Sequence, residues 1–237
     1  MIEVLRLDRV QAADAMGRLR QLDLCVREGE VHGLIGEYGV DHGHMGRLCA
    51  GLARPEEGRV YYYNRPLPPL SFLEARRQGI YLLAADGGLQ GDMTALENIY
   101  LTARRSFGWL YRRERVAREA RQYQEFFGVE FPLDGRAGEL TALQAVVVGM
   151  IGAILAGARL FILDQATSVL NEQDAVAFRR VLSCLKFKGL TVLCMVQRIE
   201  ELTRYTDRAT LVKKGTTVRC VEKDDYSYDK LLAMLLL

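Results

Sequence analysis

The sequence has few of the features that would place a chain in a membrane or outside the cell. Its longest apolar stretch, residues 142–158, contains Gln144 and several glycines. That stretch is shorter than the roughly 18 to 20 residues that a helix needs to span a bilayer. The first 30 residues contain Glu3, Asp8 and Asp14, which are not typical of a secretory signal peptide. We therefore expect a cytoplasmic protein without direct membrane insertion.

Paired cysteines and a strong net charge are missing as well. The five cysteines of the 237-residue chain are scattered, without a Cys-x-x-Cys pair or a metal-ligand spacing. Reduced, buried thiols are therefore expected rather than a disulfide framework or a zinc site. The net charge is only +2, which argues against a dedicated nucleic-acid-binding protein. Because 49% of the residues are hydrophobic, the chain can bury a sizeable core, and disorder is excluded as its main state.

The hydrophobic pattern predicts an α/β fold, because short apolar segments alternate with segments of helical periodicity. Buried strands are expected at residues 31–35, 80–83, 160–163 and 191–196, half-exposed strands at 2–7, 22–26 and 59–63, and a closing hairpin at 209–213 and 217–221. Helices are expected at 96–127 with a break near 107–108, and at 140–155, 175–185 and 228–237. The helical stretch from about 92 to 155 predicts an inserted helical subdomain in a parallel-sheet core.

A glycine-rich segment follows the first buried strand. A strand, a glycine-rich loop and a helix in this order can cradle a phosphate group with backbone amides. The segment nevertheless departs from the pattern G-x-x-x-x-G-K-[ST] at three of its four fixed positions. On its own it is a weak indication of a nucleotide site. The candidate binding residues are Gly36, Gly39, Asp41, His42, Gly43 and His44.

The motifs along the whole chain resemble, in their order, those of ATP-binding cassette (ABC) proteins, especially the sugar-importer branch. Residues 29–37 resemble the approach to the P-loop, 79–99 the Q-loop region, 140–144 the signature motif, 160–170 the Walker B strand and D-loop, and 191–197 the H-loop strand. The resemblance implies a P-loop NTPase-like cassette with a mixed central sheet, a small antiparallel β subdomain and an inserted helical subdomain. It implies a single cassette-like domain over residues 1–237.

The resemblance also implies that the P-loop has lost its chemistry. His42 stands where the family has a lysine on the β- and γ-phosphates, and Gly43 where it has a Ser or Thr on Mg²⁺. Losing one charge-assisted hydrogen bond costs about 1.5 to 3 kcal/mol. Asp41 replaces a loop glycine, and its carboxylate would repel a phosphate about 4 Å away by roughly 4 kcal/mol. Asp41 is expected either to accept amide hydrogen bonds from around Gly43 and His44 or to face solvent.

The other catalytic positions are changed in the same way. By the resemblance, Gln165 replaces the catalytic glutamate, Gln197 the H-loop histidine and Ala85 the Q-loop glutamine. An amide cannot accept a proton from water as a carboxylate can. Asp164 persists at the end of the Walker B strand, where a metal ligand and a structural cap are equal alternatives. An intact catalytic set is therefore not expected.

These expectations lead to two main hypotheses. The first is a catalytically inactive ABC cassette of sugar-importer type, a pseudo-ATPase without a cofactor. Its partner would be a competent cassette, a permease subunit or a second copy of itself, at the inner face of the cell membrane. The alternative is an ATP-binding subunit of a sugar importer whose weak activity with ATP and Mg²⁺ depends on a partner. Residues 229–234 resemble the end of a first cassette, so we expect a free-standing half of a two-cassette protein.

A third interpretation rests on a cluster of seven arginines between residues 104 and 121. They form either the solvated face of a helix or a docking face for an acidic partner or phosphates, such as a regulatory nucleic-acid contact. Binding with a steep salt dependence would distinguish the second possibility from the first.

Overall fold

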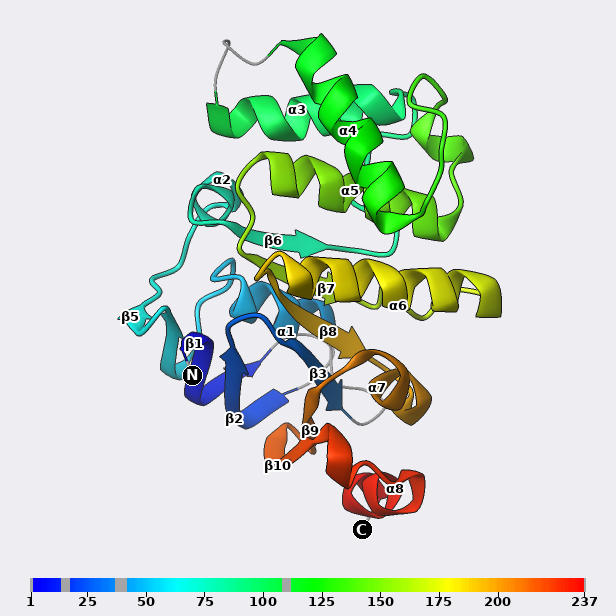
Figure 1. The fold of residues 1–237 in the computed structure, drawn as a ribbon. Coiled ribbons are helices and arrows are strands. Elements are labelled where there is room, and N and C mark those ends of the chain that lie inside the picture. Colours follow the sequence, from blue (N-terminus) through cyan, green and yellow to red (C-terminus); the bar gives the residue numbers. More distant parts are fainter. Residues whose placement is uncertain (1, 14–17, 37–41, 108–111, 237) are drawn as a thin grey trace.

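The computed structural model describes residues 2–13, 18–36, 42–107 and 112–236 (Figure 1). Within these ranges, ten strands form one sheet in the order β5-β4-β1-β2-β10-β9-β3-β8-β7-β6. The strands are β1 (Glu3–Ala13), β2 (Arg18–Arg27), β3 (Val31–Gly36), β4 (Glu57–Tyr62), β5 (Arg65–Pro66), β6 (Ile80–Leu83), β7 (Leu160–Asp164), β8 (Thr191–Val196), β9 (Arg208–Lys213) and β10 (Thr216–Glu222).

The sheet has a parallel half and an antiparallel half. Strands β6, β7, β8, β3 and β9 run parallel to one another, and β10 returns antiparallel to β9. Strands β1, β2, β4 and β5 pair antiparallel. The halves meet where β10 pairs in parallel with β2 at Thr216 and Gln21. The mixed sheet predicted from the family resemblance is confirmed.

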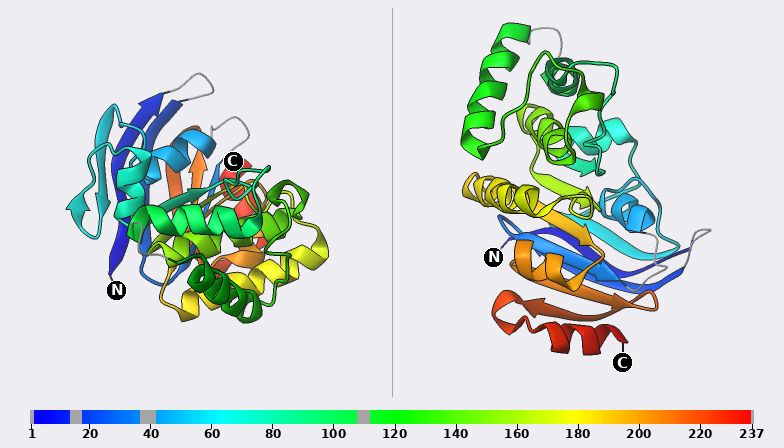
Figure 2. Two further views of the ribbon diagram at one scale, coloured as in Figure 1. Left: turned by 90° about the horizontal axis from the view of Figure 1, so that it is seen from above. Right: turned by 90° about the vertical axis from the view of Figure 1, so that its right-hand side faces the viewer.

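Helices cover the parallel half on both faces (Figures 1 and 2). They are α1 (His42–Cys49), α2 (Phe72–Arg77), α3 (Ala95–Phe107), α4 (Arg113–Phe127), α5 (Ala142–Leu155), α6 (Glu172–Phe187), α7 (Ile199–Tyr205) and α8 (Tyr228–Leu236). Helix α1 packs between the parallel strands and the antiparallel strands, where Met45, Leu48 and Cys49 are fully buried. The other face packs against residues from α3 to α8.

Strands β6, β7 and β8 are buried on both faces over most of their length, which explains their largely apolar sequences. In β7, Leu160 and Ile162 pack into the core around α1, whereas Phe161 and Leu163 pack into the core under the helices. This alternation follows from the two-residue repeat of a strand. A polar residue on either face of this strand would therefore be buried.

Helix α5 is apolar on every side and lies in the centre of the helical layer. Its first turn is closed by a capping box between Thr141 and Gln144, in which each side chain accepts a backbone N–H of the other residue. Gly149 lies against the backbone of Gly87, so closely that a Cβ there would be 2.6 Å from the Gly87 carbonyl oxygen. Only glycine permits this approach.

The predicted buried strands are confirmed, but several other elements differ from the expectation. Strands β1 and β2 are longer than predicted, and the two-residue strand β5 was not predicted. Tyr63 and Asn64 both have positive φ, which builds the tight turn that pairs β5 with β4 at the sheet edge, where proline is tolerated. The short helices α2 and α7 were not predicted. Helices α3, α4 and α5 follow one another between β6 and β7, and their status as a separate subdomain, 92–155, stays a prediction.

No helix in the described ranges is both long enough and apolar enough to cross a membrane.

Candidate functional site

The carboxyl ends of four parallel strands meet at one edge of the sheet. Ile35 of β3 lies beside Val196 of β8, and Asp164 of β7 lies beside Met195. Leu83 of β6 pairs with Leu163 in the next position. Clefts for ligands form at such edges of open α/β sheets. The fold therefore brings the ends of β3, β6, β7 and β8, which carry the predicted site residues, to one place.

The glycine-rich segment enters this edge from β3. Gly36 ends β3, and the backbone of His42 begins α1. Gly39 and Asp41 lie outside the described residues, as does the predicted hydrogen bonding of Asp41, which stays a prediction. Gly43 and His44 are half-buried in the first turn of α1. The N-terminus of a helix presents free amide groups at this point.

Asp164 and Gln165 stand at the end of β7, both half-buried. Gln165 has φ of 54°, a left-handed conformation that costs a non-glycine residue roughly 1 to 2 kcal/mol. The backbone N–H of Gln165 donates to the Met195 carbonyl of β8 at 3.3 Å, and Ser168 donates to the Gln165 carbonyl through both its hydroxyl and its N–H. These bonds turn the chain sharply and fix the backbone of Gln165 at the end of β7.

A buried polar contact, which sequence reasoning missed, anchors the loop after β7. The hydroxyl of Thr167 donates to the carboxylate of Glu201 in α7 at 2.7 Å, and Arg198 donates to the other carboxylate oxygen at 2.8 Å. Thr167 and Glu201 are both buried. The two residues are 34 positions apart in the sequence, and no local sequence pattern predicts a contact at that separation.

Gln197 and Ala85 complete the edge. Gln197 follows β8 directly and is exposed. Ala85 lies after β6 in a turn closed by a hydrogen bond from the Gly87 N–H to the Ala84 carbonyl at 3.0 Å. Gly87 has positive φ and lies against the carbonyl of Ala145 in the first turn of α5. The turn with Ala85 is thereby held against the start of α5.

The edge offers limited chemistry through its described side chains. Asp164 contributes one carboxylate, His44 an imidazole, and Gln165 and Gln197 amides, whereas Gly43 and Ala85 have no polar side chain. In the part of the chain that the structure describes, no group of three or more His, Cys, Asp and Glu side chains is arranged to hold a metal ion. The arrangement can donate and accept hydrogen bonds, and Asp164 is its one described carboxylate at a strand end.

The sequence matches the family model described as "ABC transporter" over residues 19–168, which is more than half of the chain. The chain belongs to the ABC transporter family. The match includes β3, α1, β6 and β7, whereas β8 and Gln197 at the same edge lie beyond it.

Curated relatives of this ABC cassette are named as sugar import proteins. A putative ribose/galactose/methyl galactoside import ATP-binding protein of Burkholderia cenocepacia is 27% identical over 234 residues, covering 98% of this chain and 46% of the relative. A ribose import ATP-binding protein of Rubrobacter xylanophilus is 30% identical over 215 residues, covering 90% of this chain and 43% of the relative. The chain thus spans about half the length of the curated relatives that it matches.

Solved structures confirm the cassette fold. An ATP-binding cassette of an ABC transporter in its ADP conformation has a TM-score of 0.81 at 21% identity, with 98% of this chain and 99% of the other covered. A nucleotide-free ATP-binding cassette has a TM-score of 0.80 at 23% identity, with 98% and 96% covered. At these identities the likeness establishes the fold of the cassette and not its activity.

A second polar feature of the cassette lies inside the sheet. His32 is fully buried; its Nδ1 lies 3.0 Å from Glu30 and its Nε2 lies 2.8 Å from the Thr210 hydroxyl. Burial lowers the pKa of His32, so the neutral ring donates to Glu30 and accepts from Thr210. Arg208 donates to both Glu30 carboxylate oxygens at 3.1 and 3.2 Å. This network joins β3 to β9, and its partners are far apart in sequence.

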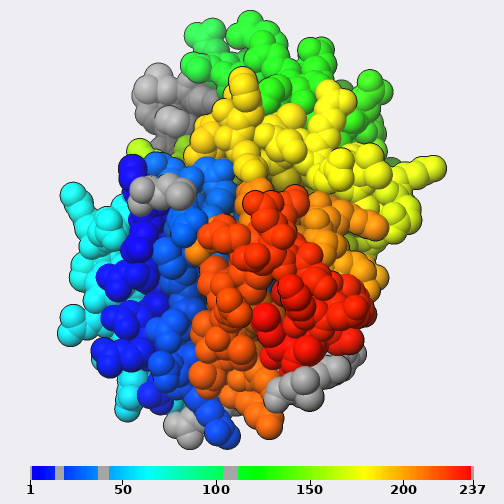
Figure 3. All heavy atoms as spheres, turned by 60° about the horizontal axis from the view of Figure 1, so that its bottom comes forward, coloured from blue at the N-terminus to red at the C-terminus, as the bar shows by residue number. Residues whose placement is uncertain are grey.

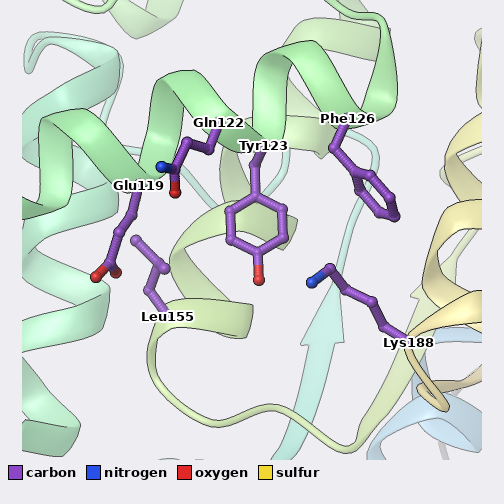
Figure 4. A pocket seen from close by; sticks show the side chains of 6 residues that line it. All are labelled: Glu119, Gln122, Tyr123, Phe126, Leu155 and Lys188. Atoms are coloured by element: carbon purple, nitrogen blue, oxygen red, sulfur yellow. The ribbon is translucent and has the colours of Figure 1, made fainter.

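A pocket of about 400 Å³ lies at the opposite edge of the parallel strands (Figure 4). Leu155 ends α5 just before β7, and Lys188 follows α6 just before β8. Tyr123 and Phe126 project from α4 toward Lys188, whose ammonium nitrogen lies 5.0 and 5.2 Å from the two ring centres. The pocket is therefore separate from the candidate site.

The arginine cluster lies partly on α4, next to this pocket. The described members, from Arg112 to Arg121, are exposed. Arg115 pairs with Glu119 at 2.7 Å, and Arg113 approaches Glu97 at 3.8 Å. Such pairs are typical of a solvated helix face.

Proposed function

We propose that this chain is a catalytically inactive cassette of sugar-importer type that acts as a binding or regulatory subunit. It would bind a permease subunit, a competent cassette or a second copy of itself, at the inner face of the cell membrane, without a nucleotide cofactor. The observation that carries the proposal is Gln165, which directly follows Asp164 at the end of β7. By the family resemblance, its amide replaces the carboxylate that would act as the general base in hydrolysis.

The other described positions support the same proposal. Mg²⁺ takes hard oxygen ligands in near-octahedral geometry, and Gly43 and Ala85 supply none. Gln197 follows β8 where the family resemblance places a histidine. The described residues therefore fit a magnesium–nucleotide complex poorly. Helix α1 and strand β7 nevertheless contribute buried apolar side chains to the cores on the two faces of the sheet.

The alternative is an ATP-binding subunit with weak or partner-dependent activity. Asp164 at the end of β7 favours it, because a carboxylate there can hold Mg²⁺ directly or through water. The relatives are named as ATP-binding proteins of ribose or galactose import, which gives the alternative its substrate class.

Two measurements on the purified chain test the proposal. The first is the steady-state release of phosphate from Mg·ATP, for which we expect no turnover above background. The matched control is the Asp164→Asn variant: turnover in the wild type that this variant loses would overturn the proposal. The second is the thermal midpoint with millimolar Mg·ATP, which we expect to stay unchanged. Saturation at one hundred times the dissociation constant would add about 2.7 kcal/mol of stability, and a shift of several degrees would favour the alternative.

The binding role needs a separate measurement. The chain is titrated into a competent sugar-import cassette, with and without its permease, and both complex formation and ATP turnover are followed. We expect a complex of defined stoichiometry. A chain that stays separate from both components at micromolar concentration would contradict a role as a subunit.

A further inference from the structure

The seam between β2 and β10 is the place where the two halves of the sheet meet. Figure 3 shows it on the face where the blue strands β1 and β2 lie beside the orange hairpin of β9 and β10. Along the described length of both strands, strand pairing is confined to Gln21 and Thr216. The N–H groups of Arg20 and Gln21 also donate to the Gly215 carbonyl, at 2.8 and 3.1 Å. The backbone ladder ends there.

Side chains hold the rest of the seam. The Thr217 hydroxyl accepts from the Asp23 N–H at 2.9 Å and donates to the Asp23 carbonyl at 2.8 Å. Farther along, Arg27 pairs with Glu222 at 3.2 Å. The two strands thus stay side by side to their ends, with a hydroxyl and an ion pair in place of the backbone hydrogen bonds.

Cys25 and Cys220 lie between these two side-chain links. Along the two strands, Asp23 and Thr217 are linked before the cysteines, and Arg27 and Glu222 pair after them. A bulge in β10 just after Thr217 shifts the following side chains. Both cysteines line one cavity of about 340 Å³. Cys25 is half-buried and Cys220 is exposed.

Arg208 lies in the same cavity and contacts one of the thiols. Its side chain is almost fully buried, and it donates from Nη2 to the Cys220 sulfur at 3.1 Å. Burial, together with the adjacent Glu3, raises the pKa of Cys25 to about 11. Cys220 is therefore the thiol that reacts first.

We propose that Cys25 and Cys220 are a modification site at which a small disulfide such as oxidised glutathione forms a reversible cross-link that closes the β2–β10 seam. In the first step the Cys220 thiolate attacks one sulfur of the oxidised glutathione and releases one glutathione thiolate. In the second step the Cys25 thiolate, formed by loss of its proton to water, attacks the Cys220 sulfur of the mixed disulfide and releases the second glutathione thiolate. Two protein thiols lose two electrons in total, and one disulfide is reduced to two thiols.

The remaining cysteines are poorly placed to compete. Cys49 and Cys194 are fully buried, and burial raises the pKa of each thiol, to about 12 for Cys49. The Cys184 thiol is half-buried and donates to the Phe126 carbonyl at 3.3 Å. The reaction is thus directed to the seam by the exposure of Cys220 and by the cavity that both thiols line.

The test treats the full-length reduced chain with oxidised glutathione and maps its thiols by peptide mass spectrometry without reduction. We expect the peptides of Cys25 and Cys220 to become linked, with loss of two hydrogen atoms and without retained glutathione. We also expect the thermal midpoint to rise by several degrees, because the cross-link closes a loop over most of the chain and restricts the unfolded state. A thiol reductant should reverse both changes.

Three variants make the outcome decisive. Cys25→Ser should stop at the mixed disulfide on Cys220, Cys220→Ser should remain largely unmodified, and the matched control Cys184→Ser should behave like the wild type. The mapping of the wild type does not depend on how well any variant folds. Retained glutathione on Cys220 as the end product, a link to a different cysteine, or two unreacted thiols would each overturn the proposal.

Discussion

Replacing Arg208 by methionine should destabilise the fold by about 3 kcal/mol. Arg208 is 6% exposed and Glu30 is 9% exposed, and the guanidinium reaches both Glu30 carboxylate oxygens within 3.2 Å. Removing one member of a buried ion pair typically costs about 3 to 5 kcal/mol, because it leaves the other charge uncompensated. Glu30 keeps two donors, the His32 ring and the Arg27 N–H, so we expect the lower end of that range.

Urea denaturation under reducing conditions measures this effect. The midpoint should fall while the slope of the free energy of unfolding against urea stays constant. The matched control is Arg179→Met on α6, an exposed arginine whose loss should change stability by no more than about 0.5 kcal/mol. Adding Glu30→Gln to Arg208→Met should recover part of the loss, because it removes the unpaired charge. A loss below about 1 kcal/mol for Arg208→Met would refute the reasoning.

Three further predictions use the same measurement. The pKa of His32 is lowered in the folded state, so its stabilising contribution is complete above the pKa of about 6.5 in the unfolded chain. Below that pH, the free energy of unfolding should fall by up to about 1.4 kcal/mol per pH unit. The variant His32→Asn should flatten this dependence of stability on pH. Gly87→Ala should lower the free energy of unfolding by about 2 kcal/mol more than Gly88→Ala. Both glycines have positive φ, but only at Gly87 would the new Cβ meet a backbone carbonyl. Equal losses of stability in the two variants would contradict the tight contact at Gly87. Gln165→Gly should leave the free energy of unfolding nearly unchanged, because it relieves a left-handed backbone conformation. Gln197→Gly should lower the free energy of unfolding by about 1 kcal/mol. A larger loss of stability for Gln165→Gly than for Gln197→Gly would show that Gln165 is not strained.

The parallel strands could be predicted from the sequence because their burial is written into consecutive residues. Residues 160–163 and 192–196 are apolar without a break, and they are buried on both faces in the structure. Once these strands are predicted, their ends are predicted as well, and so is the common edge of the sheet that carries Gly36, Asp164 and Gln197. The location of the candidate site could therefore be predicted from the sequence.

The remainder depends on contacts between distant positions. Helix α2 has six residues and α7 has seven, which is too short for a periodic pattern to distinguish them from loops. The bond between Thr167 and Glu201 joins two elements that no local rule connects. The same holds for the ring of His32, whose partner Thr210 lies 178 positions away. Tertiary packing decides these features.

The contact between the turn of Gly87 and helix α5 has a mechanical consequence. The carbonyl of Ala145 and the backbone of Gly149 touch Gly87 directly, without an intervening side chain. Side chains can rotate to absorb a displacement, but two abutting backbones cannot. A displacement of the turn that carries Ala85 would thus move α5 with it.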